Sequence, residues 1–178
     1  MSIAGVVLNG GQSSRMGQDK SELLLQGQSL IIRAQYLLQS AGIESIFVSG
    51  PQGIADETVG AGPLSGLYSS LKQLTDHEFV LFMPVDMPLI TTAMIKQLCK
   101  NKLNEVAHYD GSFFPMLIRN NSKMREQLSK QLTTGSLAIH QLLSNTDSLA
   151  VSHDWPKECF MNANTPEQWD EITAILNQ

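Results

Sequence analysis

A short apolar run followed by a glycine-rich stretch constrains this chain more than any other feature of its sequence. Residues Ile3 to Leu8 are apolar enough to form a fully buried strand. The adjacent Gly10 and Gly11 follow shortly after, and a glycine pair lets the backbone turn sharply and approach a ligand without interference from a Cβ. We therefore expect a ligand site in the loop that leaves the end of this strand.

The same loop concentrates groups that bind phosphate. Ser13 and Ser14 follow the glycines, and Arg15 and Lys20 are the only basic residues before Arg33. Main-chain N–H groups and two fixed positive charges are the chemistry that holds a polyphosphate. A glycine turn with solvated basic side chains is the alternative, but the combination of a glycine pair, two hydroxyls, an Arg and a Lys favours a phosphate site.

The glycine spacing excludes the two commonest phosphate loops. A dinucleotide-binding fingerprint needs Gly-x-Gly-x-x-Gly opening directly into a helix, whereas Gly10 and Gly11 are adjacent and Gly17 is distant. A nucleoside triphosphatase loop needs Gly-x-x-x-x-Gly-Lys-Ser/Thr, and the residues around Lys20 do not match that pattern. Residues 21–25 instead indicate a short extended segment before the first helix.

Strand and helix patterns alternate through the first half of the chain. After the first strand, the apolar spacing predicts a helix at 30–41, a buried strand at 46–48, a helix at 64–74, a strand at 79–83 and a helix from Thr91. The last of these helices is expected to end among Lys96, Lys100 and Lys102, whose charges would complement its dipole. This order predicts an α/β fold with a mostly parallel sheet and helices on both faces.

The second half of the chain is less regular. Two strands are expected at 106–109 and 113–118 around the turn Asp110-Gly111, followed by helices near 123–132 and 137–143 and a strand at 149–151. A closing helix begins at Thr165, where Thr-x-x-Gln forms a capping box. Because no repeat or linker interrupts the chain, residues 1–178 are expected to form one domain.

A single aspartate follows the most apolar strand. Asp86 lies in the sequence Met-Pro-Val-Asp-Met-Pro directly after the strand at 79–83, so it falls at the same edge of the sheet as Gly10 and Gly11. Mg²⁺ binds one or two carboxylates together with phosphate oxygens. An Asp that caps the next turn is the alternative, but the neighbouring phosphate loop favours a magnesium site at Asp86.

Two further segments leave their roles open. Gly62-Pro63-Leu64-Ser65-Gly66 suits a helix entry with close packing, and it equally suits a backbone against which a nucleobase or ribose lies. Asp56 precedes it and is a candidate to hydrogen-bond a base amino group or a ribose hydroxyl, although an exposed loop Asp is often only solvated.

Composition limits the classes of partner. The chain has 178 residues, a net charge of −5 and 42% hydrophobic residues, which argues for a globular protein and against a nucleic-acid polymer as partner. No apolar run is long enough to cross a membrane and no basic leader precedes one, so we expect a cytoplasmic protein without membrane contact. Cys99 and Cys159 suggest no disulfide, and the four isolated histidines suggest no metal site.

Together, these motifs resemble the molybdenum cofactor guanylyltransferase family. That family opens with Leu-Ala-Gly-Gly-x-Ser-x-Arg-Met-Gly-x-Asp-Lys, and this chain matches it at Leu8, Gly10, Gly11, Ser13, Arg15, Met16, Gly17, Asp19 and Lys20. Three later motifs, Gly-Pro-Leu-x-Gly, Asp-x-Pro and Asn-x-Asn-Thr-Pro, are matched at Gly62 to Gly66, Asp86 to Pro88 and Asn162 to Pro166. The four motifs occur in order and cover nearly the whole chain.

The resemblance implies a Rossmann-like nucleotidyltransferase fold that binds GTP and Mg²⁺ and transfers GMP to the terminal phosphate of molybdopterin. It implies that the nucleotide lies against Leu8, Asn9, Gly10 and Gly11, with Lys20 and Arg15 on the triphosphate and Asp86 on the metal. It further places Asp56 and Gly62 at the nucleoside, and Asn162 and Asn164 at the pterin. Transient contacts with other cofactor-assembly proteins and with molybdoenzymes are also expected.

The chain departs from the family pattern at four places. Asn9 replaces the usual Ala, and Ser49-Gly50-Pro51 stands where the family tends to carry an Asn or Arg for the nucleotide. Basic residues often found after Gly135 are missing, and Phe114 stands before Pro115 where a His is common. The alternatives are therefore a transferase that uses CTP or acts on a sugar or alcohol phosphate, or a nucleotide-binding relative without catalysis.

Overall fold

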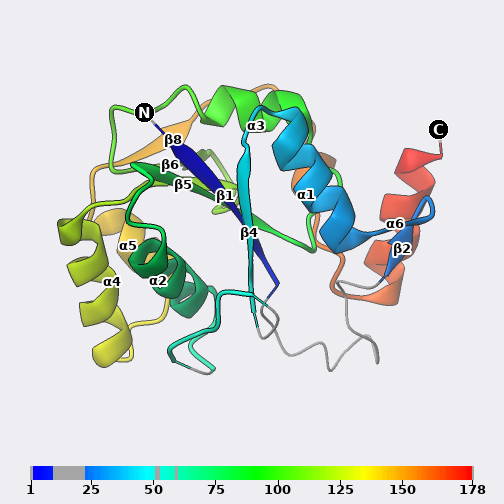
Figure 1. The fold of residues 1–178 in the computed structure, drawn as a ribbon. Coiled ribbons are helices and arrows are strands. Elements are labelled where there is room, and N and C mark those ends of the chain that lie inside the picture. The colour runs from blue at the N-terminus through cyan, green and yellow to red at the C-terminus, as the bar shows by residue number, and fades with distance from the viewer. Residues whose placement is uncertain (1, 10–22, 51–52, 59, 178) are drawn as a thin grey trace.

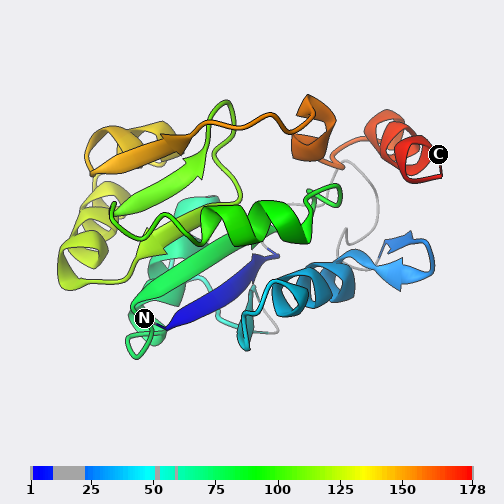
Figure 2. The ribbon, with the colours of Figure 1, turned by 90° about the horizontal axis from the view of Figure 1, so that it is seen from above.

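The computed structural model describes residues 2–9, 23–50, 53–58 and 60–177 (Figures 1 and 2). Its main sheet has six strands in the order β4-β1-β5-β7-β6-β8. Their bounds are β1 Ile3–Leu8, β4 Ser45–Ser49, β5 Phe79–Pro84, β6 Val106–Tyr109, β7 Met116–Arg119 and β8 Ser148–Val151. All of them run parallel except β7, which confirms the expected mostly parallel sheet.

The centre of the sheet is built from the two most apolar runs of the chain. β1 pairs with β5 along its whole length, from Ile3 opposite Phe79 to Leu8 opposite Pro84. Helices cover both faces of these strands, so their side chains are apolar on both sides and do not alternate with polar ones. The expectation of a second fully buried strand was wrong for β4, because β4 lies at the edge of the sheet and most of its side chains are only half-buried.

Helices lie on both faces of the sheet, as expected. One face is packed by α1 Leu30–Ser40, α3 Thr92–Leu98 and α6 Pro166–Leu176, and the other by α2 Pro63–Gln73, α4 Ser122–Thr133 and α5 Ile139–Ser144. The alternation of strand side chains divides the core accordingly, since Val7 and Leu81 belong to the first layer while Val6 and Phe82 belong to the second. Figure 2 shows α1 and α3 along one side of the sheet, with α4 and α5 toward the end that carries β8.

The short elements complete the chain. A two-stranded hairpin, β2 Leu24–Leu25 and β3 Gln28–Ser29, forms the expected extended segment before α1. β6 and β7 pair in antiparallel fashion on either side of the predicted Asp110-Gly111 turn, where Gly111 has a φ of +75°. A 3₁₀ turn, η3 Lys157–Phe160, precedes α6 and was not predicted.

Helix ends follow their capping residues. The Thr165 hydroxyl accepts from the N–H of Gln168, and the Gln168 side chain accepts from the N–H of Thr165, which confirms the capping box of α6. α3 ends at Leu98, so Lys100 and Lys102 lie beyond it, and the expectation that they occupy its last turn was wrong. Asn101 donates instead to the carbonyl oxygens of Gln97 and Leu98. Across the described residues, no helix has both the length and the apolar character needed to cross a membrane.

Candidate active site

The carboxyl ends of the three neighbouring parallel strands β4, β1 and β5 meet at one edge of the sheet. The N–H of Asn9, just after β1, donates to the carbonyl oxygen of Ser49 at 3.1 Å, and the N–H of Val85, just after β5, donates to that of Leu8 at 3.1 Å. The three loops that leave β4, β1 and β5 therefore start side by side, at the lower edge of the sheet in Figure 1. Ligands of open parallel sheets bind at such an edge.

The predicted phosphate loop leaves this edge from β1. Of the residues placed on the nucleotide by sequence, Leu8 and Asn9 lie here, with Leu8 buried and Asn9 half-buried. Gly10, Gly11, Arg15 and Lys20 lie outside the described residues, and their roles stay predictions.

Asp56 reaches the same edge because the chain turns back after β4. The N–H of Ile54 donates to the Val48 carbonyl oxygen at 2.8 Å, and the N–H of Gly50 donates to that of Ile54 at 2.9 Å. Burial raises the pKa of the Asp56 carboxyl, and the neighbouring Ser49 hydroxyl lowers it by less. Within the described part of the chain, the buried Oδ1 of Asp56 has no hydrogen-bond partner. An acceptor in this state is suited to a donor on a ligand.

The loop that follows Asp56 is fixed to the first turns of α2 by serine hydroxyls. The Oγ of Ser69 accepts from the N–H of Glu57 at 3.0 Å, and the Oγ of Ser65 accepts from that of Thr58 at 3.1 Å. Both serines are buried. The loop therefore holds Asp56 close to the start of α2.

The glycines of the Gly-Pro-Leu-x-Gly segment serve different purposes. Gly62 caps α2 with φ +62°, a conformation that favours glycine, and space remains open around it. A Cβ on Gly66 would lie 2.8 Å from the Ser49 Oγ and 3.6 Å from the Asp56 Oδ1. The segment is thus a helix entry with close packing, and it also forms a wall beside Asp56. A closely packed helix entry and a surface for a nucleobase or ribose are therefore compatible roles for this segment.

Asp86 lies in the loop after β5 and is half-buried. Its carbonyl oxygen accepts from the N–H of Ala163 at 2.7 Å. This contact brings the segment that contains Asn162 and Asn164 against the Asp86 loop, although 76 residues separate Asp86 from Asn162 in sequence. The structure therefore brings together the predicted metal residue and the two predicted pterin residues.

Residues 152–165, which we call the C-terminal strap, are held by contacts that sequence reasoning missed. The indole N–H of Trp155 donates to the Gln97 Oε1 at 2.8 Å, and the Tyr109 hydroxyl donates to the same oxygen at 3.2 Å and to the Met94 carbonyl oxygen at 2.7 Å. His153 packs against the Tyr109 ring at 5.2 Å between centroids. No local pattern marks Gln97 as an anchor, because a polar residue on a helix is usually a surface residue.

The described residues offer few groups that could hold a metal ion. The described residues contain no cluster of three or more His, Cys, Asp or Glu side chains arranged to hold a metal ion. One carboxylate that completes its coordination with phosphate oxygens and water suits Mg²⁺, and Asp86 fits that part. Cys99 and Cys159 are free, and burial raises the pKa of the Cys99 thiol to about 11, so it is a protonated packing group at neutral pH.

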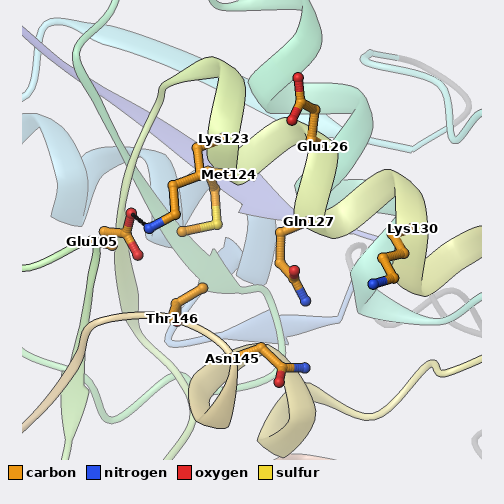
Figure 3. A pocket seen from close by; sticks show the side chains of 8 residues that line it. All are labelled: Glu105, Lys123, Met124, Glu126, Gln127, Lys130, Asn145 and Thr146. Carbon is orange, nitrogen blue, oxygen red and sulfur yellow. Dashed lines mark hydrogen bonds and ion pairs between the residues drawn. The ribbon is translucent and has the colours of Figure 1, made fainter.

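One cavity lies near this edge of the sheet, and another lies far from it. One of about 250 Å³ lies between α1 and the residues on both sides of Asp86, including Val85 and Met87. The other, of about 210 Å³, is shown in Figure 3, where Lys123 points toward Glu105. Glu105 precedes β6, so that second cavity lies at the opposite edge of the sheet and takes no part in the site.

The chain is similar to known nucleotidyltransferases over most of its length. Residues 5–148 match the family model described as the MobA-like NTP transferase domain. The molybdenum cofactor guanylyltransferase of Xanthomonas euvesicatoria pv. vesicatoria is 37% identical, and the match covers 94% of this chain and 93% of that one. A probable molybdenum cofactor guanylyltransferase of Bacillus cytotoxicus is 28% identical over 96% of each chain.

Solved structures show the same fold. The molybdopterin-guanine dinucleotide biosynthesis protein A of Archaeoglobus fulgidus has a TM-score of 0.77 at 18% identity, with 98% of each chain covered. The 2-C-methyl-D-erythritol 4-phosphate cytidylyltransferase of Thermus thermophilus has a TM-score of 0.71 at 13% identity, covering 97% of this chain and 98% of that one. These likenesses confirm the expected Rossmann-like nucleotidyltransferase fold.

Proposed function

The chain belongs to the family with the MobA-like NTP transferase domain, and on that premise we propose that it transfers GMP from GTP to molybdopterin, with or without bound molybdenum. The products are the molybdopterin guanine dinucleotide and pyrophosphate. The observation that carries the proposal is the meeting of Asp56, Asp86 and the Asn162–Asn164 segment at one strand edge, directly beyond Leu8 and Asn9.

The proposed roles follow the position of each group along that edge. Asp56 and Gly62 seat the nucleoside, because the Asp56 carboxylate is an acceptor and Gly62 leaves open space at the start of α2. Gly10, Gly11, Arg15 and Lys20 hold the triphosphate, with the two basic side chains offsetting its charge as pyrophosphate leaves. Asn162 and Asn164 orient molybdopterin, so that an oxygen of its terminal phosphate forms a bond to the α-phosphorus while the bond to pyrophosphate breaks.

Asp86 would hold Mg²⁺ in this proposal. When bound, the ion neutralises phosphate charge and orients the triphosphate. The N–H···O bond between Ala163 and Asp86 couples the loop that would hold the metal to the strap that would hold the acceptor. A shift of either segment would therefore disturb both substrates, since small misplacements in such sites are costly.

The test is turnover with purified protein, GTP, molybdopterin and MgCl₂, followed as pyrophosphate release and as the dinucleotide product. Asp86→Asn should lower kcat by roughly 10³-fold or more and leave the thermal unfolding midpoint near that of the wild type. Asp76→Asn is the matched control, because Asp76 is an exposed aspartate in the turn after α2. Retained turnover in Asp86→Asn would rule out the metal role, and no dinucleotide product from the wild type would rule out the function.

A transferase that uses CTP is the second candidate. Its support is the strand-end sequence Ser49-Gly50, which carries no large side chain toward the nucleotide, together with the shared fold of the Thermus thermophilus cytidylyltransferase. The same assay with CTP in place of GTP separates the two. A single domain over residues 1–178, a cytoplasmic location and contacts with other assembly proteins or molybdoenzymes stay predictions.

A further inference from the structure

The cavity between α1 and the loop after β5 has no role in the proposed reaction. It has a volume of about 250 Å³ and lies between α1 and residues 83–92, on the face of the sheet that α1 and α3 cover (Figure 1). Most of its lining is apolar and includes Leu30, Leu37 and Ile90. An apolar cavity of about 150 Å³ is large enough for benzene, so this one has room for a bicyclic ring.

Arg33 is the charged side chain among the described residues that line the cavity. It is half-buried, and its Nε donates to the Pro88 carbonyl oxygen at 3.4 Å. Within residues 2–9, 23–50, 53–58 and 60–177, no Asp or Glu pairs with Arg33, and its two terminal nitrogens make no hydrogen bond. Because a charge removed from water is normally paired, this guanidinium is suited to an anion that enters the cavity.

The groups around the cavity favour a carboxylate that is attached to a flat ring. A guanidinium group matches the two oxygens of a carboxylate with two parallel N–H donors, whereas phosphate sites usually gather several cations or main-chain N–H groups. Tyr36 also lines the cavity and is 66% exposed, which places this ring at the opening. Aromatic rings attract one another in stacked or edge-to-face arrangements, so Tyr36 is available to a ring of the ligand.

We propose that this cavity binds a small carboxylic acid with a flat apolar ring. The carboxylate lies on the Arg33 guanidinium, and the ring lies between α1 and the side chains of Met83 and Met87. The inference goes beyond the proposed function and does not depend on it. Val85 and Met87 flank Asp86 and both line the cavity, so the ligand contacts both neighbours of the proposed metal residue without occupying the substrate site.

The test uses indole-3-acetate and indole-3-acetamide, which share a ring system and differ in a carboxylate against a neutral amide. Calorimetry measures the affinity of the protein for each. The wild type should bind indole-3-acetate at least about tenfold more tightly, because its hydrogen bonds to Arg33 are charge-assisted. In protein labelled with ¹³C at the methionine methyl groups, the NMR signals of Met83 and Met87 should shift. The signal of Met124, which is buried in the layer on the opposite face of the sheet, should not.

Two variants locate the carboxylate and the ring. Arg33→Met keeps an apolar stem and removes the charge, so it should bind the two probes equally. Arg125→Met is the matched control, because Arg125 is a half-buried arginine of α4 that donates to Asn120, and it should keep the wild-type preference. Ala34→Leu adds three carbons to a residue that lines the cavity. It should abolish binding of both probes while the thermal unfolding midpoint stays near that of the wild type.

Three results would overturn the inference. They are equal affinity of the wild type for the two probes, unmoved Met83 and Met87 signals at millimolar indole-3-acetate, and a wild-type preference that persists in Arg33→Met. GTP binding, measured on the same wild-type protein, tests the proposed function separately. Loss of one result therefore leaves the other standing.

Discussion

The two ends of the candidate site are built in opposite ways. On the proposed nucleotide side, Gly50 and Gly53 bring backbones close together, and Gly66 lies against the side chains of Ser49 and Leu8. The Asp56 Oδ1 has no partner among the described residues. On the acceptor side, the C-terminal strap uses its own polar side chains, with Trp155 bonded to Gln97. In the proposed site, the nucleotide side therefore keeps hydrogen-bonding groups for a ligand, whereas polar side chains of the strap hold the strap in position.

Of the residues on these two sides of the site, closely packed glycines of the nucleotide side should lose the most stability when they are substituted. A Cβ on Gly53 would overlap the carbonyl oxygen of Val48, which is backbone and cannot rotate away. We expect Gly53→Ala to lower the free energy of unfolding by about 3 kcal/mol, measured by urea denaturation. Gly60→Ala, with φ +82° but open space around the added Cβ, should cost only about 1 kcal/mol. Equal losses would show that close packing at Gly53 is unimportant.

The strap should be weakened by removal of a single donor. Trp155→Phe keeps a ring but deletes the N–H that donates to Gln97, so we expect a loss of about 1 kcal/mol in the free energy of unfolding. The amide of Ala163 should also exchange faster with solvent, because the strap carries its bond to Asp86. Trp169→Phe, in α6, should leave that exchange rate unchanged. Unchanged exchange in Trp155→Phe would mean that the strap is held elsewhere.

Removal of the Asp56 carboxylate should raise the free energy of unfolding, the opposite of the change expected in the strap, because we propose that this group binds a ligand rather than supporting the fold. Burial raises its pKa in the folded protein, so the folded state binds this proton more tightly than the unfolded state does. Stability at this group is therefore lost as pH rises from the unfolded pKa through the raised folded pKa. Asp56→Asn should stabilise the protein at pH 7 by less than about 1 kcal/mol, since solvent screens a half-buried group.

The same substitution should weaken GTP binding. Its stabilising effect should shrink as pH falls through the raised folded pKa of Asp56 and vanish below the unfolded pKa. Urea denaturation at several pH values, together with calorimetry, measures both effects. A destabilised Asp56→Asn protein at pH 7 would show that the carboxylate serves the fold rather than a ligand.

The smallest effect is expected at the far edge of the sheet, which belongs to neither side of the comparison. The Lys123 Nζ lies 2.8 Å from the Glu105 Oε1, and its hydrogen bond is the largest cause that lowers the Glu105 pKa. Lys123→Met should cost about 0.5 kcal/mol at pH 7. That cost should be present above the unfolded pKa of Glu105 and disappear as pH falls through its lowered folded pKa. Nucleotide binding should not change, and a change would place the cavity of Figure 3 within the functional site.

Much of this architecture could be predicted because its signals are local. The apolar runs at 3–8 and 79–83 indicated the central strands, and the Thr165 and Gln168 pair indicated the start of α6. The edge position of β4 could not be predicted, because it depends on where the neighbouring strands pair. The end of α3 at Leu98 depends on the capping contacts of Asn101, which a lysine-rich pattern obscures.

The residues of the proposed site could be predicted from the sequence more readily than the contacts between its segments. Asp56, Asp86, Asn162 and Asn164 were all predicted from the sequence, and the Asp86 carbonyl oxygen accepts from the N–H of Ala163, the residue between the two asparagines. The link from Gln97 to the strap could not be predicted, since it joins residues 58 positions apart with no local pattern at either end. The roles of Gly10, Gly11, Arg15 and Lys20 remain predictions from sequence.

The most direct test of the proposed nucleotide site is calorimetric binding of GTP, CTP and ATP to the purified protein, with and without Mg²⁺. We expect a clear preference for GTP that depends on Mg²⁺ and is lost in Asp86→Asn. A preference for CTP would contradict the guanine assignment and favour the cytidine-using transferase. Binding of none of the three would contradict a nucleotide site at this edge of the sheet.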